Sequence, residues 1–226
     1  MSRPPRLPQQ HGHDQHGSSH SHAPMPVTDA DWQKRYSPEP VWSGHPNAAL
    51  VAEVDDLPPG TAVDVGCGEG ADAVWLAGKG WQVTAFDVAD AALERGREAA
   101  TAAGVEVDFK LGGLLNVELP AESFDLVITC YPALLRSPER LAETELLGLV
   151  APGGRLLMLA HADIDREQAI EHGFDPDDYL DPSDLLAAAE TGWTVERNEQ
   201  RPRTINSGAG AGHHADLILL LRREGS

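Results

Sequence analysis

The chain has 226 residues, enough for one ordinary domain and too few for two. It carries 36 acidic and 17 basic residues, and its formal net charge of -19 argues against nucleic acid and anionic membranes as partners. No apolar run approaches the roughly 20 residues of a bilayer span, and we expect no secretory signal. With only Cys67 and Cys130, a disulfide framework and a thiolate zinc cluster are excluded, so a cytoplasmic location is expected.

Residues 1–26 are rich in Pro, Gly, Ser, Gln and His, and they contain too few apolar groups to offset the entropy of ordering. We predict a disordered tail. Its closely spaced imidazoles suggest weak metal binding, but nothing preorganises them as ligands, so a solvated polar tail is the favoured interpretation. These histidines are His11, His13, His16, His20 and His22.

Two short helices are predicted next. Thr28-Asp29 is a capping signal for a helix through Tyr36, and Pro46-Asn47 opens a second helix that runs roughly to Val54. A Pro- and Gly-containing turn then ends this segment. We expect residues 27–57 to form a helical lid on a single domain that covers residues 27–226.

Beyond residue 60, short apolar runs alternate with helix-like stretches. This alternation predicts an α/β fold with a mostly parallel sheet, right-handed crossovers and helices on both faces. The predicted strands are Thr61–Val65, Gln82–Phe86, Val105–Phe109, Phe124–Thr129, Arg155–Ala160, Trp193–Glu199 and Ala215–Arg222. The predicted helices are Gly70–Lys79, Asp90–Ala103 with Asp90 as its cap, Pro138–Val150 with Pro138 in its first turn, and Pro182–Ala189 after the cap Asp181.

The last two strands have no helix between them. We therefore expect an antiparallel hairpin at the edge of the sheet, joined by a long loop, Arg201–His214. A sharp turn is expected at residues 151–154, before the fifth strand.

A glycine-rich turn, Gly66-Cys67-Gly68-Glu69-Gly70, follows the first strand. Glycines there allow positive φ and close approach of a ligand at the carboxyl end of a strand, where open α/β sheets bind ligands. Read as Gly66-x-Gly68-x-x-Ala71, the turn also matches a dinucleotide fingerprint. Asp64 inside the strand favours a different cofactor, because a buried carboxylate needs a partner such as the ammonium group of S-adenosylmethionine (SAM).

The pattern Asp64-x-Gly66-x-Gly68-x-Gly70 resembles motif I of the class I SAM-dependent methyltransferases. Asp87 ends the second strand, 23 residues after Asp64, where an acidic residue accepts hydrogen bonds from ribose hydroxyls. Residues 124–128 and 151–156 resemble the family's fourth-strand motif and the turn before its fifth strand. The resemblance spans roughly residues 60–160 and implies SAM as cofactor and a Rossmann-like seven-stranded methyltransferase fold.

The N-terminal segment sharpens this likeness. Trp32-x-x-Arg35-Tyr36 and residues 41–47 are similar to the lead-in of bacterial methyltransferases of the tellurite-resistance and thiopurine type, where the segment folds over the cofactor. The resemblance implies that Arg35 faces the SAM carboxylate and that Trp42 packs near the cofactor. Alternatively, both residues merely pack a helix against the sheet.

One departure from the family concerns the adenine site. No acid follows the third strand until Glu118, so adenine would be held by backbone groups near Gly113 and Leu114.

Cys67 and Cys130 are interpreted as small residues that line a tight pocket, in preference to a redox or metal role. The predicted cofactor-binding set is Arg35, Trp42, Asp64, Gly66, Cys67, Gly68, Gly70, Asp87, Val88, Gly113, Leu114 and Cys130, without metal ligands.

Candidate catalytic groups follow from the strand ends. Tyr131 comes after the fourth strand and His161 after the fifth, and His161 is the first choice for substrate contact or general-base duty. A supporting or surface role for that histidine is the alternative. We expect residues 25–50, 162–180 and 201–214 to cover the acceptor, with Arg201 and Arg203 either meeting an anionic acceptor or offsetting the acidic surface.

The sequence thus predicts in-line methyl transfer from SAM to a sulfur, oxygen or nitrogen atom of a small molecule, by a monomer or homodimer. A protein side chain is the second candidate substrate. Two alternative functions stay open: an NAD(P)-dependent oxidoreductase, which Asp64 argues against, and a SAM-binding or metal-handling protein without turnover.

Overall fold

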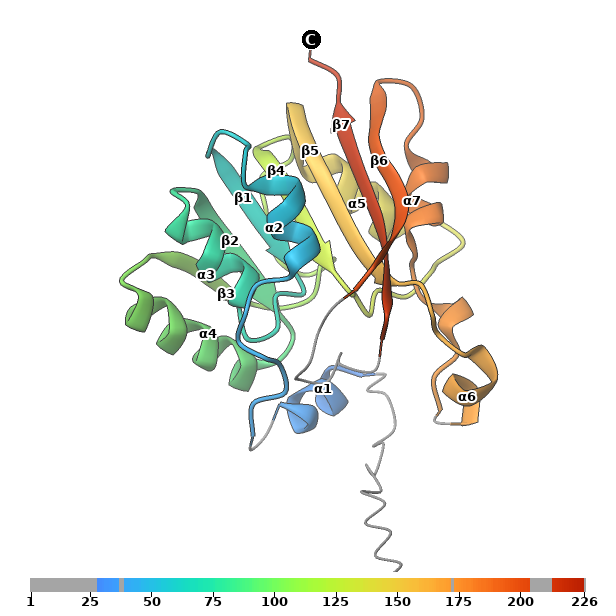
Figure 1. Ribbon diagram of the computed structural model, residues 1–226, viewed down its shortest axis with the longest axis horizontal. Coiled ribbons are helices and arrows are strands. Elements are labelled where there is room, and N and C mark those ends of the chain that lie inside the picture. Colours follow the sequence, from blue (N-terminus) through green and yellow to red (C-terminus); the bar gives the residue numbers. More distant parts are fainter. Residues whose placement is uncertain (1–27, 37–38, 172, 204–212, 226) are drawn as a thin grey trace, which may run out of the picture.

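The computed structural model describes residues 28–36, 39–171, 173–203 and 213–225. Its centre is a seven-stranded sheet of order β3-β2-β1-β4-β5-β7-β6, in which β7 runs antiparallel to both of its neighbours (Figure 1). The predicted α/β class, strand number and terminal hairpin are confirmed. The strands are β1 (Thr61–Val65), β2 (Gln82–Asp87), β3 (Val107–Leu111), β4 (Phe124–Cys130), β5 (Val150–His161), β6 (Trp193–Pro202) and β7 (Ala215–Arg223).

Helices cover both faces of this sheet. They are α1 (Asp29–Arg35), α2 (Ala48–Val54), α3 (Ala71–Gly78), α4 (Asp90–Ala103), α5 (Leu141–Leu149), α6 (Arg166–Glu171), α7 (Pro182–Ala188) and the 3-10 turn η1 (Pro176–Asp178). The helices α2 and α3 pack into one apolar cluster with the sheet, and α5 and α7 pack into the other. The helix α1 lies below the end at which β1 and β4 finish (Figure 1).

Strand side chains alternate between the two clusters. In β5, Leu157 and Leu159 face α2 and α3, whereas Leu156 and Met158 face α5 and α7. The same period of two in β1 places Asp64 on the α3 side. This alternation brings a carboxylate into an apolar layer beside the first turn of α3.

Two predicted helix features are wrong, and one helical segment was not predicted. Asp90 does not cap α4, because the N-cap position is occupied by Ala89, whose side chain makes no capping hydrogen bond. The backbone N–H of Ala89 donates to Asp87 Oδ1. The helix α5 begins at Leu141 rather than at Pro138, because a turn precedes it and Ser137 Oγ accepts from Leu141 N. In the segment expected only as a cover, residues 162–180, the chain forms α6 and η1.

The observed ends of several strands differ from the predicted ones, because pairing with neighbouring strands sets them rather than the local hydrophobic pattern. The strand β3 starts two residues later than predicted because β2 sets its register, with Val83 opposite Val107. The turn expected at residues 151–154 is an irregularity inside β5, since Phe124 pairs with Val150 and Leu126 with Arg155. Both hairpin strands are also longer than expected, and the extension of β6 to Pro202 takes in the start of the predicted loop.

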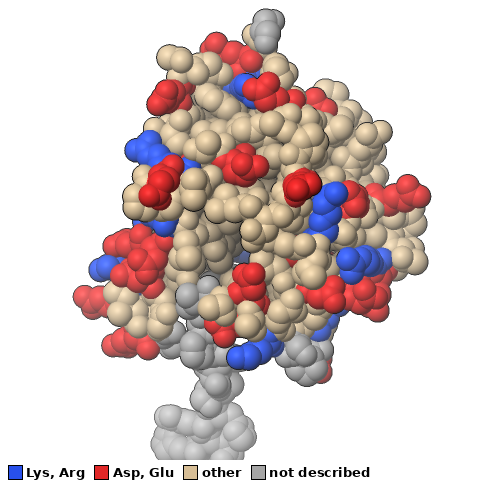
Figure 2. Space-filling view, turned by 180° about the vertical axis from the view of Figure 1, so that it is seen from behind, with Lys and Arg blue, Asp and Glu red and all other residues tan. Residues whose placement is uncertain are grey.

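The predictions of a disordered tail and of weak metal binding by its five histidines concern residues 1–26, which lie outside the described part of the chain. Within the described residues, no helix is long and apolar enough to cross a bilayer. On the face drawn in Figure 2, acidic side chains are widely spread and basic ones lie scattered among them.

Two helical glycines allow a matched test of the packing. A Cβ at Gly96 in α4 would lie 2.8 Å from Cε1 of Phe109, whereas a Cβ at Gly148 in α5 meets nothing within 4 Å. We expect Gly148→Ala to stabilise the protein by up to about 1 kcal/mol through helix propensity, and Gly96→Ala to destabilise it. Thermal unfolding of both variants measures this, and a stabilising Gly96→Ala would contradict the packing described here.

Candidate cofactor and acceptor site

A cavity of about 460 Å³ opens at the carboxyl ends of the parallel strands, within the usual range for small-molecule sites. It brings together every predicted cofactor and catalytic residue except Arg35. The Arg35 Nε is buried and has no hydrogen-bond partner among the described residues. Its neighbours Trp32 and Tyr36 line the cavity instead.

The glycine turn is shaped by positive φ at Gly66, Gly68 and Gly70 (71°, 54° and 75°). The backbone N–H groups of Gly66 and Cys67 both donate to the carbonyl of Phe86. A Cβ at Gly68 would lie 2.8 Å from the Tyr36 hydroxyl, so glycine is required there for close approach as well as for backbone conformation.

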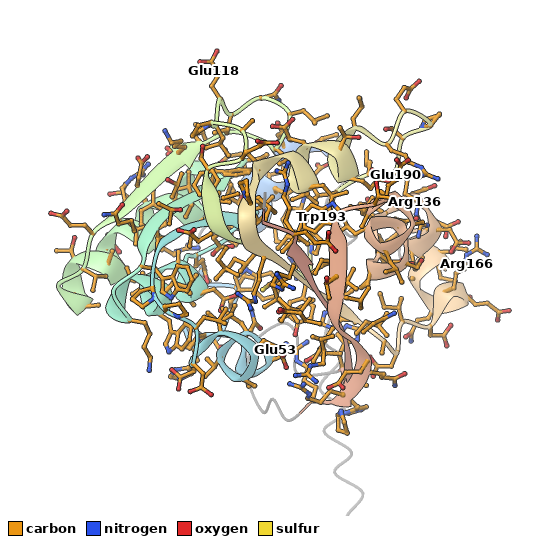
Figure 3. The ribbon with its side chains drawn as sticks, turned by 90° about the horizontal axis from the view of Figure 1, so that it is seen from above. Glu53, Glu118, Arg136, Arg166, Glu190 and Trp193 are labelled. Carbon is orange, nitrogen blue, oxygen red and sulfur yellow. The ribbon has the colours of Figure 1, made fainter. Side chains whose placement is uncertain are left out.

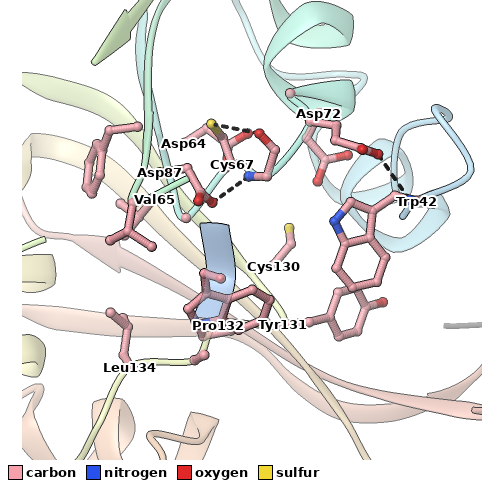
Figure 4. A pocket seen from close by; sticks show the side chains of 18 of the residues that line it. Trp42, Asp64, Val65, Cys67, Asp72, Asp87, Cys130, Tyr131, Pro132 and Leu134 are labelled. Atoms are coloured by element: carbon pink, nitrogen blue, oxygen red, sulfur yellow. Dashed lines mark hydrogen bonds between the residues drawn. The ribbon is translucent and has the colours of Figure 1, made fainter. Parts of the chain in front are cut away.

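Asp87 joins the end of β2 to this turn. One carboxylate oxygen accepts from Gly68 N at 2.8 Å and the other from Ala89 N at 2.9 Å (Figure 4). Burial raises the pKa of this carboxyl above its usual value, against the effect of these bonds. Since each carboxylate oxygen has a second lone pair, Asp87 retains the capacity to accept from ribose hydroxyls.

Asp64, Asp72 and Asp87 line the same end of the cavity (Figure 4). Asp64 is 2% exposed, and its Oδ2 is buried with no hydrogen-bond partner among the described residues. Burial, followed by the charges of Asp72 and Asp87, raises its pKa well above the usual value. An unpaired buried carboxylate is costly unless a cation or donor meets it, so this end fits the ammonium group of SAM.

Two acidic side chains that the sequence reasoning missed fasten residues 39–47, here called the strap, over the turn. Glu69 accepts from Val41 N and Trp42 N at 3.0 Å each, and it pairs with Arg95 at 2.8 Å. Asp72 accepts from both the backbone N and the side-chain Nδ2 of Asn47 at 2.7 Å. Glu69 lies within the glycine motif and Asp72 just after it, and the acidic character of these two positions could have indicated that they bind a neighbouring segment.

Aromatic side chains complete the cover. Trp42 Nε1 donates to the Tyr36 hydroxyl at 2.9 Å, and Trp32 stacks on Tyr36 with ring centres 6.1 Å apart. Gln33 Nε2 donates to the carbonyl of Val88 at 2.8 Å, which docks α1 beside the end of β2. Trp42 thus lines the cavity, held by Tyr36 and by Glu69.

The other end of the cavity contains Tyr131, His161 and Arg203. His161 is sandwiched between Tyr131, with ring centres 4.3 Å apart, and His213, with ring centres 3.7 Å apart. Arg203 Nη1 lies 3.0 Å from His161 Nδ1, and its guanidinium carbon lies 4.5 Å from the centre of the Tyr131 ring. The sequence analysis singled out Tyr131, His161 and Arg203 but did not predict that they form one cluster with His213.

Asp216 on β7 supports this cluster. It accepts from the Tyr131 hydroxyl at 3.0 Å and lies 3.5 Å from Arg203 Nη1. Tyr131 has a φ of 54°, a strained conformation for a non-glycine residue that often marks functional sites. Burial raises the pKa of Tyr131, so its hydroxyl keeps its proton.

Backbone around Gly112 and Gly113 lines the region predicted for adenine. The N–H of Gly112 donates to the carbonyl of Asp87 at 3.0 Å, which places that region beside Asp87. Glu118 is exposed and points away from the body of the molecule (Figure 3), so it does not replace the missing acid.

Cys67 and Cys130 line the cavity as unpaired thiols. Burial raises both pKa values well above the usual range, and the protonated form is the inert one. Within the described ranges, no group of three or more His, Cys, Asp or Glu side chains is arranged to hold a metal ion.

Residues 62–154 match the family model described as a methyltransferase domain. This part of the chain therefore resembles the class I, SAM-dependent methyltransferases in sequence, and the seven-stranded sheet resembles them in fold. A protein of Oryza sativa subsp. japonica named "Probable tocopherol O-methyltransferase, chloroplastic" is 29% identical over 161 residues, 63% of this chain and 44% of that protein. The chain spans less than half the length of the curated relatives it matches.

Two solved structures share the fold. A structure titled "Conversion of a Disulfide Bond into a Thioacetal Group during Echinomycin Biosynthesis" is 27% identical, covers 87% of this chain and 90% of its own, and has a TM-score of 0.66. The 1,6-didemethyltoxoflavin-N1-methyltransferase of Burkholderia thailandensis, solved with 1,6-didemethyltoxoflavin and S-adenosylhomocysteine, is 20% identical, covers 78% of this chain and 76% of its own, and has a TM-score of 0.56. SAM is the cofactor of this domain.

Asp64 is expected to lower the stability of the ligand-free protein while it strengthens cofactor binding. An amide is easier to bury than an unpaired carboxylate, so Asp64→Asn should raise the melting temperature of the ligand-free protein by about 2 °C or more. The same change should weaken binding of S-adenosylhomocysteine at least tenfold. Differential scanning calorimetry and titration calorimetry measure the two effects, and an undiminished affinity would remove the assigned role of Asp64.

Glu69 allows a test of the strap. Glu69→Ala removes the acceptor for two strap N–H groups, so amide hydrogen exchange in residues 39–47 should accelerate and S-adenosylhomocysteine affinity should fall about tenfold, equivalent to about 1.4 kcal/mol. Glu94→Ala, which removes an exposed acid of α4 that pairs with Arg97, is the control. Equal exchange rates in both variants would show that Glu69 does not hold the strap.

Proposed function

We propose that this protein transfers a methyl group from SAM to a sulfur, oxygen or nitrogen atom of a small molecule. The observation that carries the proposal is a single cavity with two chemically distinct ends. The carboxylates of Asp64, Asp72 and Asp87 gather at one end, and Tyr131, His161 and Arg203 gather at the other. A cationic cofactor and a separate acceptor are thereby accommodated side by side.

At the cofactor end, we assign each lining residue a contact with SAM. Asp64 meets the ammonium group, Asp87 accepts from the ribose hydroxyls, and backbone near Gly113 and Leu114 contacts adenine. The strap and Trp42 cover the site and exclude water. Bound SAM supplies a methyl group on a sulfonium, and the protein contributes by fixing the acceptor in line with it.

The acceptor end is mainly apolar. Residues 132–135, Pro-Ala-Leu-Leu, line it next to Tyr131, and the exposed side chain of Leu135 adds apolar surface there. Such a wall suits a compact, partly apolar molecule. The names of the rice relative and of the echinomycin structure support oxygen and sulfur acceptors, respectively.

Membership of the tellurite-resistance and thiopurine-type group is a further part of the proposal. The strap over the glycine turn supports it, because that arrangement is what the sequence resemblance implied. Arg35, which does not line the cavity, gives it no support. A reducing, cytoplasmic setting is proposed from the two unpaired cysteines at the site.

Calorimetry with S-adenosylhomocysteine, with NAD in parallel, tests the cofactor site. We expect micromolar binding of S-adenosylhomocysteine, none of NAD, and at least a tenfold loss in Asp87→Ala. Asp108→Ala, on the exposed side of β3, is the control for loss of an acid.

Protein that binds the cofactor is then screened with thiols, phenols and amines for methylated product by mass spectrometry. Tight NAD binding in place of S-adenosylhomocysteine would overturn the cofactor assignment. Binding of S-adenosylhomocysteine without product from any acceptor would leave a binding protein in place of the proposed enzyme.

A further inference from the structure

The geometry points to a role for His161 that differs from general-base catalysis. We infer that Arg203 fixes His161 as a neutral imidazole with its proton on Nε2, so that His161 donates a hydrogen bond to the acceptor and does not remove its proton. The inference about the acceptor rests on the proposed methyl transfer, whereas the state of the imidazole does not.

The donor inventory decides the tautomer. Arginine has only N–H donors and no acceptor, so the 3.0 Å contact between Arg203 Nη1 and His161 Nδ1 requires an unprotonated Nδ1. A neutral imidazole then carries its proton on Nε2. Among the described residues, no group hydrogen-bonds to Nε2, and His161 lines the cavity. The free N–H is therefore available to a ligand.

The surroundings oppose protonation from several sides. Both faces of the ring are covered, by Tyr131 and His213, and the charged groups nearby are Arg203, Asp163 and Asp216. Burial, then His213 and Arg203, lower the pKa of His161 to about 3, while Asp163 acts in the opposite direction. The acids are occupied elsewhere: Asp163 holds His213 and His214 N, and Asp216 holds Tyr131 and Arg203.

This state limits the acceptor class. Neither His161 nor the Tyr131 hydroxyl, which donates to Asp216, is placed to take a proton. The favoured acceptors have an attacking atom that is already unprotonated near neutral pH, such as a thiolate, an acidic phenol or an amine lone pair. They also carry a lone-pair-bearing group that accepts from His161 Nε2–H.

The electron count is simple for such an acceptor. The lone pair of the attacking atom forms the new bond to the methyl carbon, the sulfur–methyl bond breaks, and the sulfur keeps that electron pair. A thiol or phenol gives up its proton to water before this step.

The direct test is nitrogen NMR of the full chain saturated with S-adenosylhomocysteine. Loss of one imidazole signal set in His161→Gln identifies His161. We expect the Nε2–H tautomer and no titration step between pH 5 and 8. In Arg203→Leu the tautomers should mix and a titration step should enter that range. Arg203→Lys, which keeps a charged donor, should resemble the wild type.

Arg201→Leu is the matched control, because Arg201 lies two residues away and pairs with Glu53 and Glu199 instead. It should leave the His161 signals unchanged. A wild-type His161 that carries its proton on Nδ1, or that titrates between pH 5 and 8, would overturn the inference whatever the fate of the proposed enzyme activity.

Turnover provides a second readout with substituted thiophenols and phenols as acceptors. Glutamine presents an acceptor toward Arg203 and an N–H donor toward the cavity, so His161→Gln should keep activity within about fivefold while His161→Ala loses more. A base role predicts equal losses of about 100-fold or more for both variants, which would contradict a donor role. Absence of turnover would count against the proposed function alone, since the NMR result decides the tautomer.

Discussion

The arrangement of the site depends on the burial of three carboxylates around the turn that follows β1. Asp87 holds Gly68 N and Ala89 N, and thereby sets both the turn and the start of α4. Asp72 is satisfied by Asn47, and that contact positions α2. Asp64 alone keeps an oxygen without a partner among the described residues. Local donors thus satisfy both oxygens of two of these acids, and the free oxygen of Asp64 is the one that we propose to meet a cationic ligand.

At the acceptor end, in contrast, the polar side chains are paired with one another. Arg203 and Tyr131 both supply donors to Asp216, and Arg203 also reaches His161. The outcome is a neutral, stacked aromatic surface whose charges are already paired. The charged side chains are therefore concentrated at the end proposed for the cofactor, whereas the end proposed for the acceptor offers apolar contacts and the Nε2–H group that we infer for His161.

The sequence predicted most of the fold because parallel strands, capping residues and glycine turns are local or periodic signals. It predicted the cavity residues because motif I and the strand ends carry them. It failed where strand pairing sets an element, since β3 takes its register from β2, and where a local turn was not recognised, since the turn at Ser137 delays the start of α5. Glu69 was read as a spacer in the glycine motif, yet it binds backbone 27 and 28 residues away.

The acceptor end was the least predictable part for a further reason. The family match ends at residue 154, whereas His161, Arg203 and Asp216 all lie beyond it. His161 and Arg203 are 42 residues apart and meet only because β7 inserts between β5 and β6. In the proposed function, the matched segment holds SAM, and the hairpin in the last third of the chain supplies residues that contact the acceptor.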